Sequence, residues 1–289
     1  MLLVLWIVLA IGAAVLLYAM FIERNWFAVR THRIPCLPEG TSTKTILHLS
    51  DLHLRAPQRR KRAFLKRLAR VEPDLLIATG DFIGDGSSNA ETVDAVTAIH
   101  SRQASLYVLG SNDYYAPRPK NPLRYFTKKR RLVLGKPNPW RGLVEALDAR
   151  GWRLINNTAV QIDGIDVVGL DDEHIGRADL TVARARDGDG FRLAVAHSPD
   201  VAEHLARLGY DLIVCGHTHG GQVCIPWFGA IVTNSNLPRR MARGVHRLGD
   251  AWLHVSAGLG TSMYAPFRMA CRPEVCVLEL VPRRSPQES

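Results

Sequence analysis

The sequence predicts an α/β protein with two β-sheets packed face to face and helices on their outer faces, preceded by an N-terminal membrane-spanning helix. Apolar runs of strand length recur along the chain, and amphipathic helical segments separate several of them. The first 22 residues hold no charged side chain, which predicts the membrane helix. A hydrophobic content of 47% and a charged content of 22% indicate a globular body rather than a disordered chain.

Residues 1–22 are long and apolar enough to cross the hydrocarbon core of a bilayer as one helix. A secretory signal peptide is the alternative, but no Lys or Arg precedes the apolar run and no clear small-residue cleavage site follows it. We therefore expect a single-pass anchor in the cell membrane. Arg24, Arg30 and Arg33 follow this segment, which favours a cytoplasmic body by the positive-inside rule, with an exported body as the alternative.

Residues 23–43 are expected to form an irregular tether, because Pro35 and Pro38 interrupt regular structure. We expect one domain over residues 44–281 and a polar tail over residues 282–289. The five cysteines are odd in number and irregularly spaced, which argues against a disulfide framework.

Within this domain, strands and helices alternate as in βαβ units. The first helix has Phe64, Leu68 and Val71 on one face, the spacing of a helix that packs on a sheet. The predicted strands are residues 45–49, 74–79, 106–109, 159–162, 165–170, 192–196, 212–215, 252–256 and 274–280. The predicted helices are residues 58–71, 91–100 and 200–208.

The net charge of +10 is concentrated in two segments. Residues 55–70 hold eight Lys and Arg, residues 118–141 hold nine, and neither segment contains an acidic residue. We expect a long irregular basic insertion over residues 116–140, in which Tyr125 and Phe126 are interleaved with the cations. Such patches favour an anionic partner, and beside a membrane segment we expect lipid headgroups rather than nucleic acid.

Five short polar motifs follow five of the predicted strands. They are Asp51-Leu52-His53, Gly80-Asp81, Gly110-Ser111-Asn112-Asp113, Ala196-His197-Ser198 and Gly216-His217-Thr218-His219. Strand ends on one edge of a sheet converge, so we expect these side chains to meet. Carboxylate, amide and imidazole donors together are typical of a two-metal centre.

The order and spacing of these motifs resemble the calcineurin-like metallophosphoesterases over roughly residues 43–281. Residues 216–223 and the segment Cys271-Arg272-Pro273-Glu274 are similar to those of membrane-associated or wall-associated bacterial phosphodiesterases in that family. The resemblance implies a four-layer αββα sandwich of two mixed β-sheets flanked by helices. It also implies two divalent ions, for which this donor set suits manganese, iron or zinc.

The resemblance assigns seven metal ligands: Asp51, His53, Asp81, Asn112, His197, His217 and His219. Asp81 would bridge the two ions. One ion would be completed by Asp51, His53 and His219, and the other by Asn112, His197 and His217.

The third motif departs from the family pattern, in which Asn and His follow the glycine. Ser111 and Asn112 stand at those two positions, and either could reach the metal. We expect Asn112 to be the ligand, because an amide oxygen binds metal better than a neutral hydroxyl. The histidine that usually assists the leaving group is missing, so esters with poor leaving groups should react slowly. Asp113 and His174 are the candidate substitute acids.

The resemblance therefore implies a membrane-anchored phosphoesterase that cleaves phosphodiester or pyrophosphate bonds with a two-metal-activated hydroxide. A lipid-linked or wall-linked, amphipathic phosphoester is the expected substrate. The alternatives are a pyrophosphatase acting on a nucleotide-activated lipid sugar, a cyclic-nucleotide phosphodiesterase, and, in another class, a metal-poor binding module. The sequence does not indicate an oligomeric state.

Overall fold

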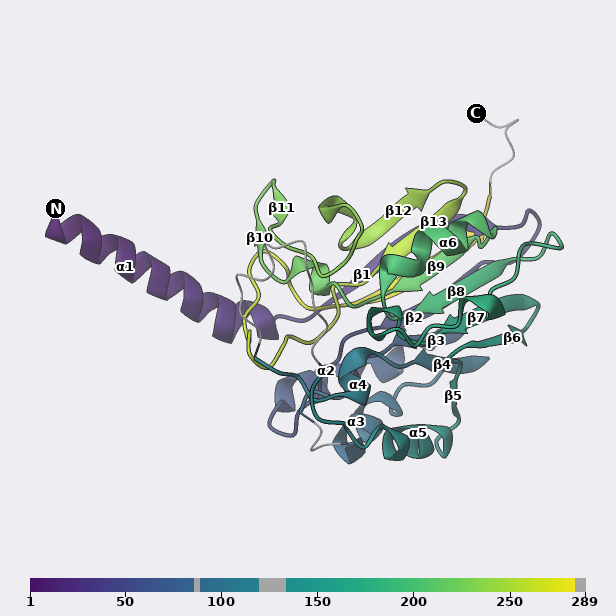
Figure 1. The fold of residues 1–289 in the computed structure, drawn as a ribbon, viewed down its shortest axis with the longest axis horizontal. Coiled ribbons are helices and arrows are strands. Elements are labelled where there is room, and N and C mark those ends of the chain that lie inside the picture. The colour runs from purple at the N-terminus through teal and green to yellow at the C-terminus, as the bar shows by residue number, and fades with distance from the viewer. Residues whose placement is uncertain (86–88, 120–133, 284–289) are drawn as a thin grey trace.

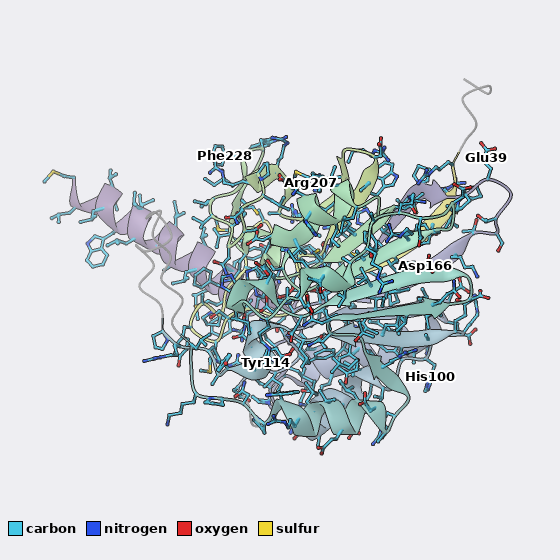
Figure 2. All side chains as sticks on the ribbon, turned by 45° about the vertical axis from the view of Figure 1, so that its right-hand side comes forward. Glu39, His100, Tyr114, Asp166, Arg207 and Phe228 are labelled. Carbon is cyan, nitrogen blue, oxygen red and sulfur yellow. The ribbon has the colours of Figure 1, made fainter. Side chains whose placement is uncertain are left out.

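The computed structural model describes residues 1–85, 89–119 and 134–283. A helix at the N-terminus projects from a body built of two β-sheets (Figure 1). This helix, α1 (Leu2–Leu17), continues through a π-helical turn at Tyr18–Ile22 and a 3₁₀ turn at Glu23–Asn25. No residue of α1 is buried, and its side chains point away from it along its length (Figure 2). The whole segment Leu2–Asn25 is long and apolar enough to cross a membrane.

The first sheet has six strands in the order β1-β14-β2-β3-β4-β5. Strands β2, β3, β4 and β5 run parallel to one another, whereas β14 is antiparallel to β2 and parallel to β1. The strands are β1 (Ala28–Leu37), β2 (Lys44–Leu49), β3 (Leu75–Thr79), β4 (Ala104–Val108), β5 (Trp152–Leu154) and β14 (Glu274–Pro282).

The second sheet has six strands in the order β12-β13-β9-β8-β7-β6. Its four central strands are parallel, and the two edge strands pair antiparallel with their neighbours. The strands are β6 (Thr158–Ile162), β7 (Ile165–Leu170), β8 (Arg192–Ala196), β9 (Leu212–Cys215), β12 (Gly244–Leu248) and β13 (Ala251–Val255). A separate two-stranded hairpin comprises β10 (Cys224–Ile225) and β11 (Gly229–Ala230).

Alternation of apolar side chains along the strands divides the core into three parts. Ile46 and Ile77 of the first sheet join Val195 and Val214 of the second in the core between the sheets. Leu47 and its outward-facing neighbours pack against α2 (Arg59–Arg67), α3 (Asn89–Val96) and α5 (Trp140–Asp148). Another apolar cluster covers the outer face of the second sheet beneath α6 (Ala202–Arg207). Both sheets are mixed and covered by helices, so the predicted four-layer αββα sandwich is confirmed.

The prediction of an irregular tether is wrong over Ala28–Leu37, which form β1. This strand pairs with β14 along the edge of the first sheet. An edge strand tolerates Pro35 because no ladder partner needs its missing N–H on the open side. Its outward side chains are polar or exposed, which obscures the strand pattern in the sequence.

The predicted helices and strands of the body agree with the structure, with shifted ends. The second predicted helix begins at Asn89 and ends at Val96, earlier than expected. Helix α5 and strands β5 and β12 were not predicted. Residues 120–133, including Tyr125 and Phe126, and most of the predicted tail lie outside the described residues. All five cysteines are buried and free, in line with the prediction against a disulfide framework.

Candidate metal centre

Three neighbouring strands of the first sheet carry candidate ligands just beyond their carboxyl ends. Asp51 and His53 follow β2, Asp81 follows β3, and Asn112 lies in the short helix α4 (Ser111–Tyr114) after β4. Because β2, β3 and β4 are parallel, these residues emerge at the same edge of the sheet.

The second sheet carries histidines in the equivalent position. His197 follows β8, and His217 and His219 follow β9. Asp172 and His174 follow the parallel neighbour β7. The two sheets therefore bring their polar loops to one common edge.

Asp51, His53, Asp81 and His219 form one cluster, in which one donor atom of each residue lies within 4.8 Å of the others. His53 Nε2 is 3.3 Å from Asp81 Oδ2 and 3.3 Å from His219 Nε2. His219 Nε2 is 3.8 Å from Asp51 Oδ1. These four residues are the set that the sequence assigns to the first metal together with the bridging carboxylate.

The other predicted ligands also gather around Asp81. Asn112 donates from Nδ2 to Asp81 Oδ2 at 2.6 Å and from its backbone N–H to Oδ1 at 2.8 Å. His197 Nε2 lies 3.7 Å from Asp81 Oδ2 and 3.1 Å from His217 Nδ1. Asp81 Oδ2 is therefore near donors of both groups, 3.3 Å from His53 Nε2 and 3.7 Å from His197 Nε2.

The backbone at these ligands is strained. Asp51, His53, Asp81, His217 and His219 all have positive φ angles, between 39° and 69°, although none is glycine. Non-glycine residues rarely adopt this region, and such strain concentrates at functional sites. The neighbouring fold holds it in place: the backbone N–H groups of Asp51 and His53 donate to the carbonyl oxygens of Gly80 and Asp81.

Gly110 allows the loops to approach closely. A Cβ atom at this position would lie 2.4 Å from Asp81 Oδ1 and 2.7 Å from His197. Only a residue without a side chain leaves room for both of these ligands.

Negative charge is concentrated and buried in this site. Burial, with the Asp81 carboxylate, raises the pKa of Asp113 to about 7 and those of Asp51 and Asp172 to about 6, against the opposing charge of His197. Burial lowers the pKa of His197, but the carboxylates of Asp81, Asp172 and Asp51 outweigh it and raise that pKa to about 9. So many buried carboxyl groups require compensating positive charge.

An orphaned atom also favours bound cations. Asp172 Oδ2 is buried without a hydrogen-bond partner among the described residues. The donors around Asp81 are carboxylate oxygens and imidazole nitrogens, which suit divalent transition metals. The residues present therefore fit metal ions.

The candidate acids occupy different environments. Asp113 is fully buried, and its carboxylate accepts hydrogen bonds from the backbone N–H groups of Asp81, Ile83 and Gly110. These hydrogen bonds hold the loops after β3 and β4 together. The His174 ring centroid, in contrast, is 4.6 Å from that of His217, so His174 does lie beside the site.

Sequence reasoning missed three residues that support the site. Asp172 lies in the polar turn Asp171–His174, of which only His174 was predicted as a site residue. Asn234 contacts His217 Nε2 through its carbonyl oxygen at 3.0 Å, from a segment without a motif. The guanidinium of Arg268 is buried and donates to the carbonyl oxygens of Ala257, Gly258 and Gly260, which fixes the loop over Asp51 and His53. The nearby Cys271-Arg272-Pro273-Glu274 segment was the available signal for the last of these.

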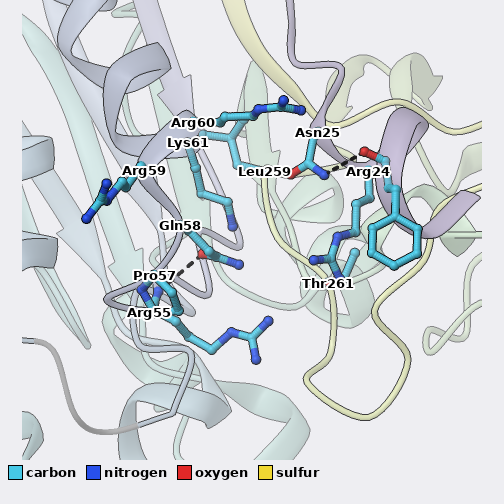
Figure 3. A pocket seen from close by; sticks show the side chains of 11 residues that line it. Arg24, Asn25, Arg55, Pro57, Gln58, Arg59, Arg60, Lys61, Leu259 and Thr261 are labelled. Atoms are coloured by element: carbon cyan, nitrogen blue, oxygen red, sulfur yellow. Dashed lines mark hydrogen bonds between the residues drawn. The ribbon is translucent and has the colours of Figure 1, made fainter.

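A cationic pocket of about 630 Å³ lies between the end of the N-terminal helical segment and α2 (Figure 3). Five cations line it: Arg24, Arg55, Arg59, Arg60 and Lys61. Leu259 also lines it, and its N–H donates to the carbonyl oxygen of Ser50, next to Asp51. Since Arg55 is two residues beyond His53, the pocket borders the metal centre.

Comparisons with known proteins agree with this geometry. A family model described as calcineurin-like phosphoesterase matches residues 44–221. The chain is 28% identical to phosphodiesterase YaeI of Escherichia coli (strain K12), over 91% of this chain and 92% of that protein. It is also 28% identical to the UDP-2,3-diacylglucosamine pyrophosphatase LpxG of Chlamydia trachomatis serovar D, over 81% of this chain and 82% of that protein.

A third relative has a longer chain. A Bos taurus transmembrane protein with a metallophosphoesterase domain is 26% identical over 87% of this chain and 55% of that protein. The family match covers more than half of the sequence and includes every candidate ligand. The chain therefore belongs to the calcineurin-like phosphoesterase family.

Proposed function

We propose that this protein is a membrane-anchored, metal-dependent phosphodiesterase that cleaves phosphodiester or pyrophosphate bonds in an amphipathic, lipid-linked or wall-linked substrate. The observation that carries the proposal is that Asp81 Oδ2 lies near donors of both groups, 3.3 Å from His53 Nε2 and 3.7 Å from His197 Nε2. The named activities of the two relatives, a phosphodiesterase and a pyrophosphatase, support the same reaction class.

Asp51, His53 and His219 hold one divalent cation in this proposal, Asn112, His197 and His217 hold a second, and Asp81 is shared. Manganese, iron and zinc suit these donors. Bound there, two such ions supply an activated water nucleophile and neutralise charge on the phosphoryl oxygens.

In this proposal, residues next to the metal ligands hold the reacting groups in position. The backbone N–H of Asn112 donates to Asp81 Oδ1 and helps to fix the shared carboxylate. Its contact with Asp81 favours Asn112 over Ser111 as the third-motif ligand, through its side-chain oxygen after rotation of the amide. His174, beside His217, is the remaining candidate to protonate a leaving group.

The N-terminal helix supports a membrane location. Its 24-residue apolar span ends at Asn25, and the cationic pocket begins there with Phe21 and Arg24. An anionic headgroup in this pocket would place an attached phosphoester close to His53. Arg24, Arg30 and Arg33 follow the span, so we propose a cytoplasmic body, with the exported side as the alternative.

The cationic side chains that line the pocket favour an anionic ligand. Lys61 is buried, and its Nζ donates to the carbonyl oxygen of Leu52 at 2.7 Å. Burial and the nearby charges of Arg268, Arg55 and Arg24 lower its pKa well below the usual value. A bound phosphate would relieve this repulsion between cations.

The test uses the full chain, purified in detergent and loaded with Mn²⁺. We expect hydrolysis of bis-p-nitrophenyl phosphate, and its loss in Asp81→Ala but not in Asp94→Ala, which alters an exposed carboxylate on α3. No Mn²⁺ binding and no hydrolysis by the wild type would overturn the enzyme proposal and favour a binding module.

The substrate class is tested by comparing three compounds at equal enzyme concentration. We expect UDP-2,3-diacylglucosamine, the substrate that LpxG's name indicates, to be cleaved with a higher kcat/KM than cyclic AMP or bis-p-nitrophenyl phosphate. Preference for cyclic AMP would instead support the cyclic-nucleotide alternative and contradict the amphipathic substrate.

A further inference from the structure

A second group of metal-ligating side chains lies away from the phosphoesterase centre. His32, His254 and Cys276 each offer a donor atom within 4.8 Å of the other two. His32 lies on β1, Cys276 on the adjacent β14, and His254 on β13 of the other sheet. The group therefore joins the two sheets across the core between them.

Two nitrogens of this group are buried without a partner. Nε2 of His32 and Nε2 of His254 make no hydrogen bond within the described part of the chain. The whole side chain of His254 is inaccessible to solvent, as is that of Cys276, whereas His32 is partly exposed. A buried polar atom without a partner is rare and unfavourable, and two in one cluster call for a ligand.

A chain of hydrogen bonds determines where His254 carries its proton. Ser50 Oγ donates to Asp51 Oδ2 at 2.5 Å, and Thr79 Oγ1 donates to Ser50 Oγ at 2.8 Å. The hydroxyl proton of Thr79 is therefore not available for a second hydrogen bond. Its oxygen, 2.9 Å from His48 Nε2, must accept a hydrogen bond from that nitrogen.

Burial lowers the pKa of His48 to about 3, so this ring is neutral and its Nδ1 carries no proton. His254 Nδ1, 3.1 Å away, must then be the donor. Burial also lowers the pKa of His254 well below its usual value, so its ring is neutral and Nε2 keeps a free lone pair. A histidine that binds a metal through one nitrogen ordinarily donates from the other to a fixed acceptor, as His254 does to His48.

We propose that His32, His254 and Cys276 form a second metal site, which takes a divalent transition cation that prefers nitrogen and sulfur donors, such as Zn²⁺. Zinc binds imidazole nitrogen at about 2.0 Å and thiolate sulfur at about 2.3 Å, so small inward movements of the three side chains suffice. Cys276 releases its thiol proton to water when the metal binds. Partly exposed His32, on the edge strand β1, provides the entry side and leaves a fourth position for water.

This site differs in chemistry from the phosphoesterase centre, whose predicted ligands include no thiol. A thiolate bound to Co²⁺ gives a charge-transfer absorption in the near ultraviolet, which oxygen and nitrogen ligands do not give. We therefore titrate the full chain in detergent with Co²⁺ and record this band. The wild type should show the band, and Cys276→Ser should lose it.

Matched variants make the result specific. Cys36→Ser alters another fully buried thiol in the same core between the sheets, and should keep the band. Asp81→Ala should also keep it, so the outcome does not depend on the proposed phosphodiesterase. Absence of the band from the wild type, or its persistence in Cys276→Ser, would overturn the proposal.

A second variant decides the question if Cys276→Ser does not fold. His32→Ala alters a partly exposed residue. It should weaken the Co²⁺ affinity, measured from this absorption band, by about tenfold or more. The control His100→Ala alters an exposed imidazole and should bind Co²⁺ as the wild type does. Equal Co²⁺ affinity in His32→Ala and the wild type would contradict the site.

Discussion

The two sheets contribute different chemistry to one site. The first sheet carries Asp51, His53, Asp81 and Asn112 beyond its strands, and it supplies all the predicted oxygen donors and, through the two aspartates, the negative charge. The second carries only histidines among the predicted ligands. We infer that the first sheet supplies most of the attraction for cations, whereas the second adjusts the position and number of donors.

The ligand loops of the two sheets also depend on each other. The backbone N–H of His217 donates to the Asp51 carboxylate, so a loop of the second sheet fixes a ligand of the first. His197 Nδ1 pairs with the carbonyl oxygen of Thr79 at 2.6 Å, which links the sheets at β3. The site is therefore complete only when the two sheets are packed together.

The largest expected effect comes from the residue shared by both halves. Asp81→Ala removes the contact between the donor groups and should lower kcat/KM for bis-p-nitrophenyl phosphate by about a thousandfold or more. Metal ions contribute several kcal/mol to transition-state stabilisation, and each 1.36 kcal/mol is about tenfold in rate. Steady-state kinetics and metal content per chain measure the effect. If Asp81→Ala kept more than about a tenth of the wild-type activity, Asp81 would not be the residue on which the ligands of both sheets depend.

A pair of substitutions compares the sheets directly. Asp51→Asn removes a charge from the first sheet and should weaken Mn²⁺ binding by about a hundredfold, whereas His217→Gln on the second should weaken it by about tenfold. Both replacements keep the approximate size of the side chain. Calorimetric titration with Mn²⁺ measures both affinities, and a larger loss in His217→Gln would reverse our assignment of roles.

Restoring the family pattern of the third motif should raise the activity rather than lower it. The double substitution Ser111→Asn and Asn112→His restores both the amide ligand and the protonatable group of the family pattern, and should raise kcat on a phosphodiester with a poor alkoxide leaving group by about tenfold. This is less than the roughly hundredfold or more of a well-placed acid, because the loop is not adapted to it. Hydrolysis of bis-p-nitrophenyl phosphate, whose leaving group needs no acid, is the control. No gain on the poor leaving group would count against the role of the missing histidine.

The smallest effect concerns the cationic pocket beside the first sheet. Arg59→Ala should raise KM for UDP-2,3-diacylglucosamine by about fivefold, the effect of about 1 kcal/mol for a cation near an anionic headgroup. KM for bis-p-nitrophenyl phosphate should not change. The control Arg207→Ala removes an exposed cation from α6, on the second sheet. Equal KM values for the lipid substrate in both variants would exclude a role for the pocket.

The sequence predicted most of the body because its signals are local. Apolar runs such as Leu75–Thr79 are buried on both faces, and a polar motif follows directly at Gly80 and Asp81. Parallel neighbours bring such motifs together at one edge, and the resemblance to a known family assigns the seven predicted ligands within them.

The remaining features depend on contacts between distant residues. Strand β1 pairs with β14, more than 200 residues later, and its polar side chains conceal it. The buried position of Asp113 depends on three amides from two loops, so a sequence cannot distinguish it from a catalytic acid. His32, His254 and Cys276 follow no motif and meet only because the sheets pack.

The most direct test of the central claim is electron paramagnetic resonance of the Mn²⁺-loaded full chain. If Asp81 joins two metal sites, the spectrum should show two exchange-coupled Mn²⁺ ions in the wild type and lose this coupling in Asp81→Ala. A wild-type spectrum of isolated Mn²⁺ ions only, unchanged in Asp81→Ala, would contradict a shared carboxylate between the two sheets.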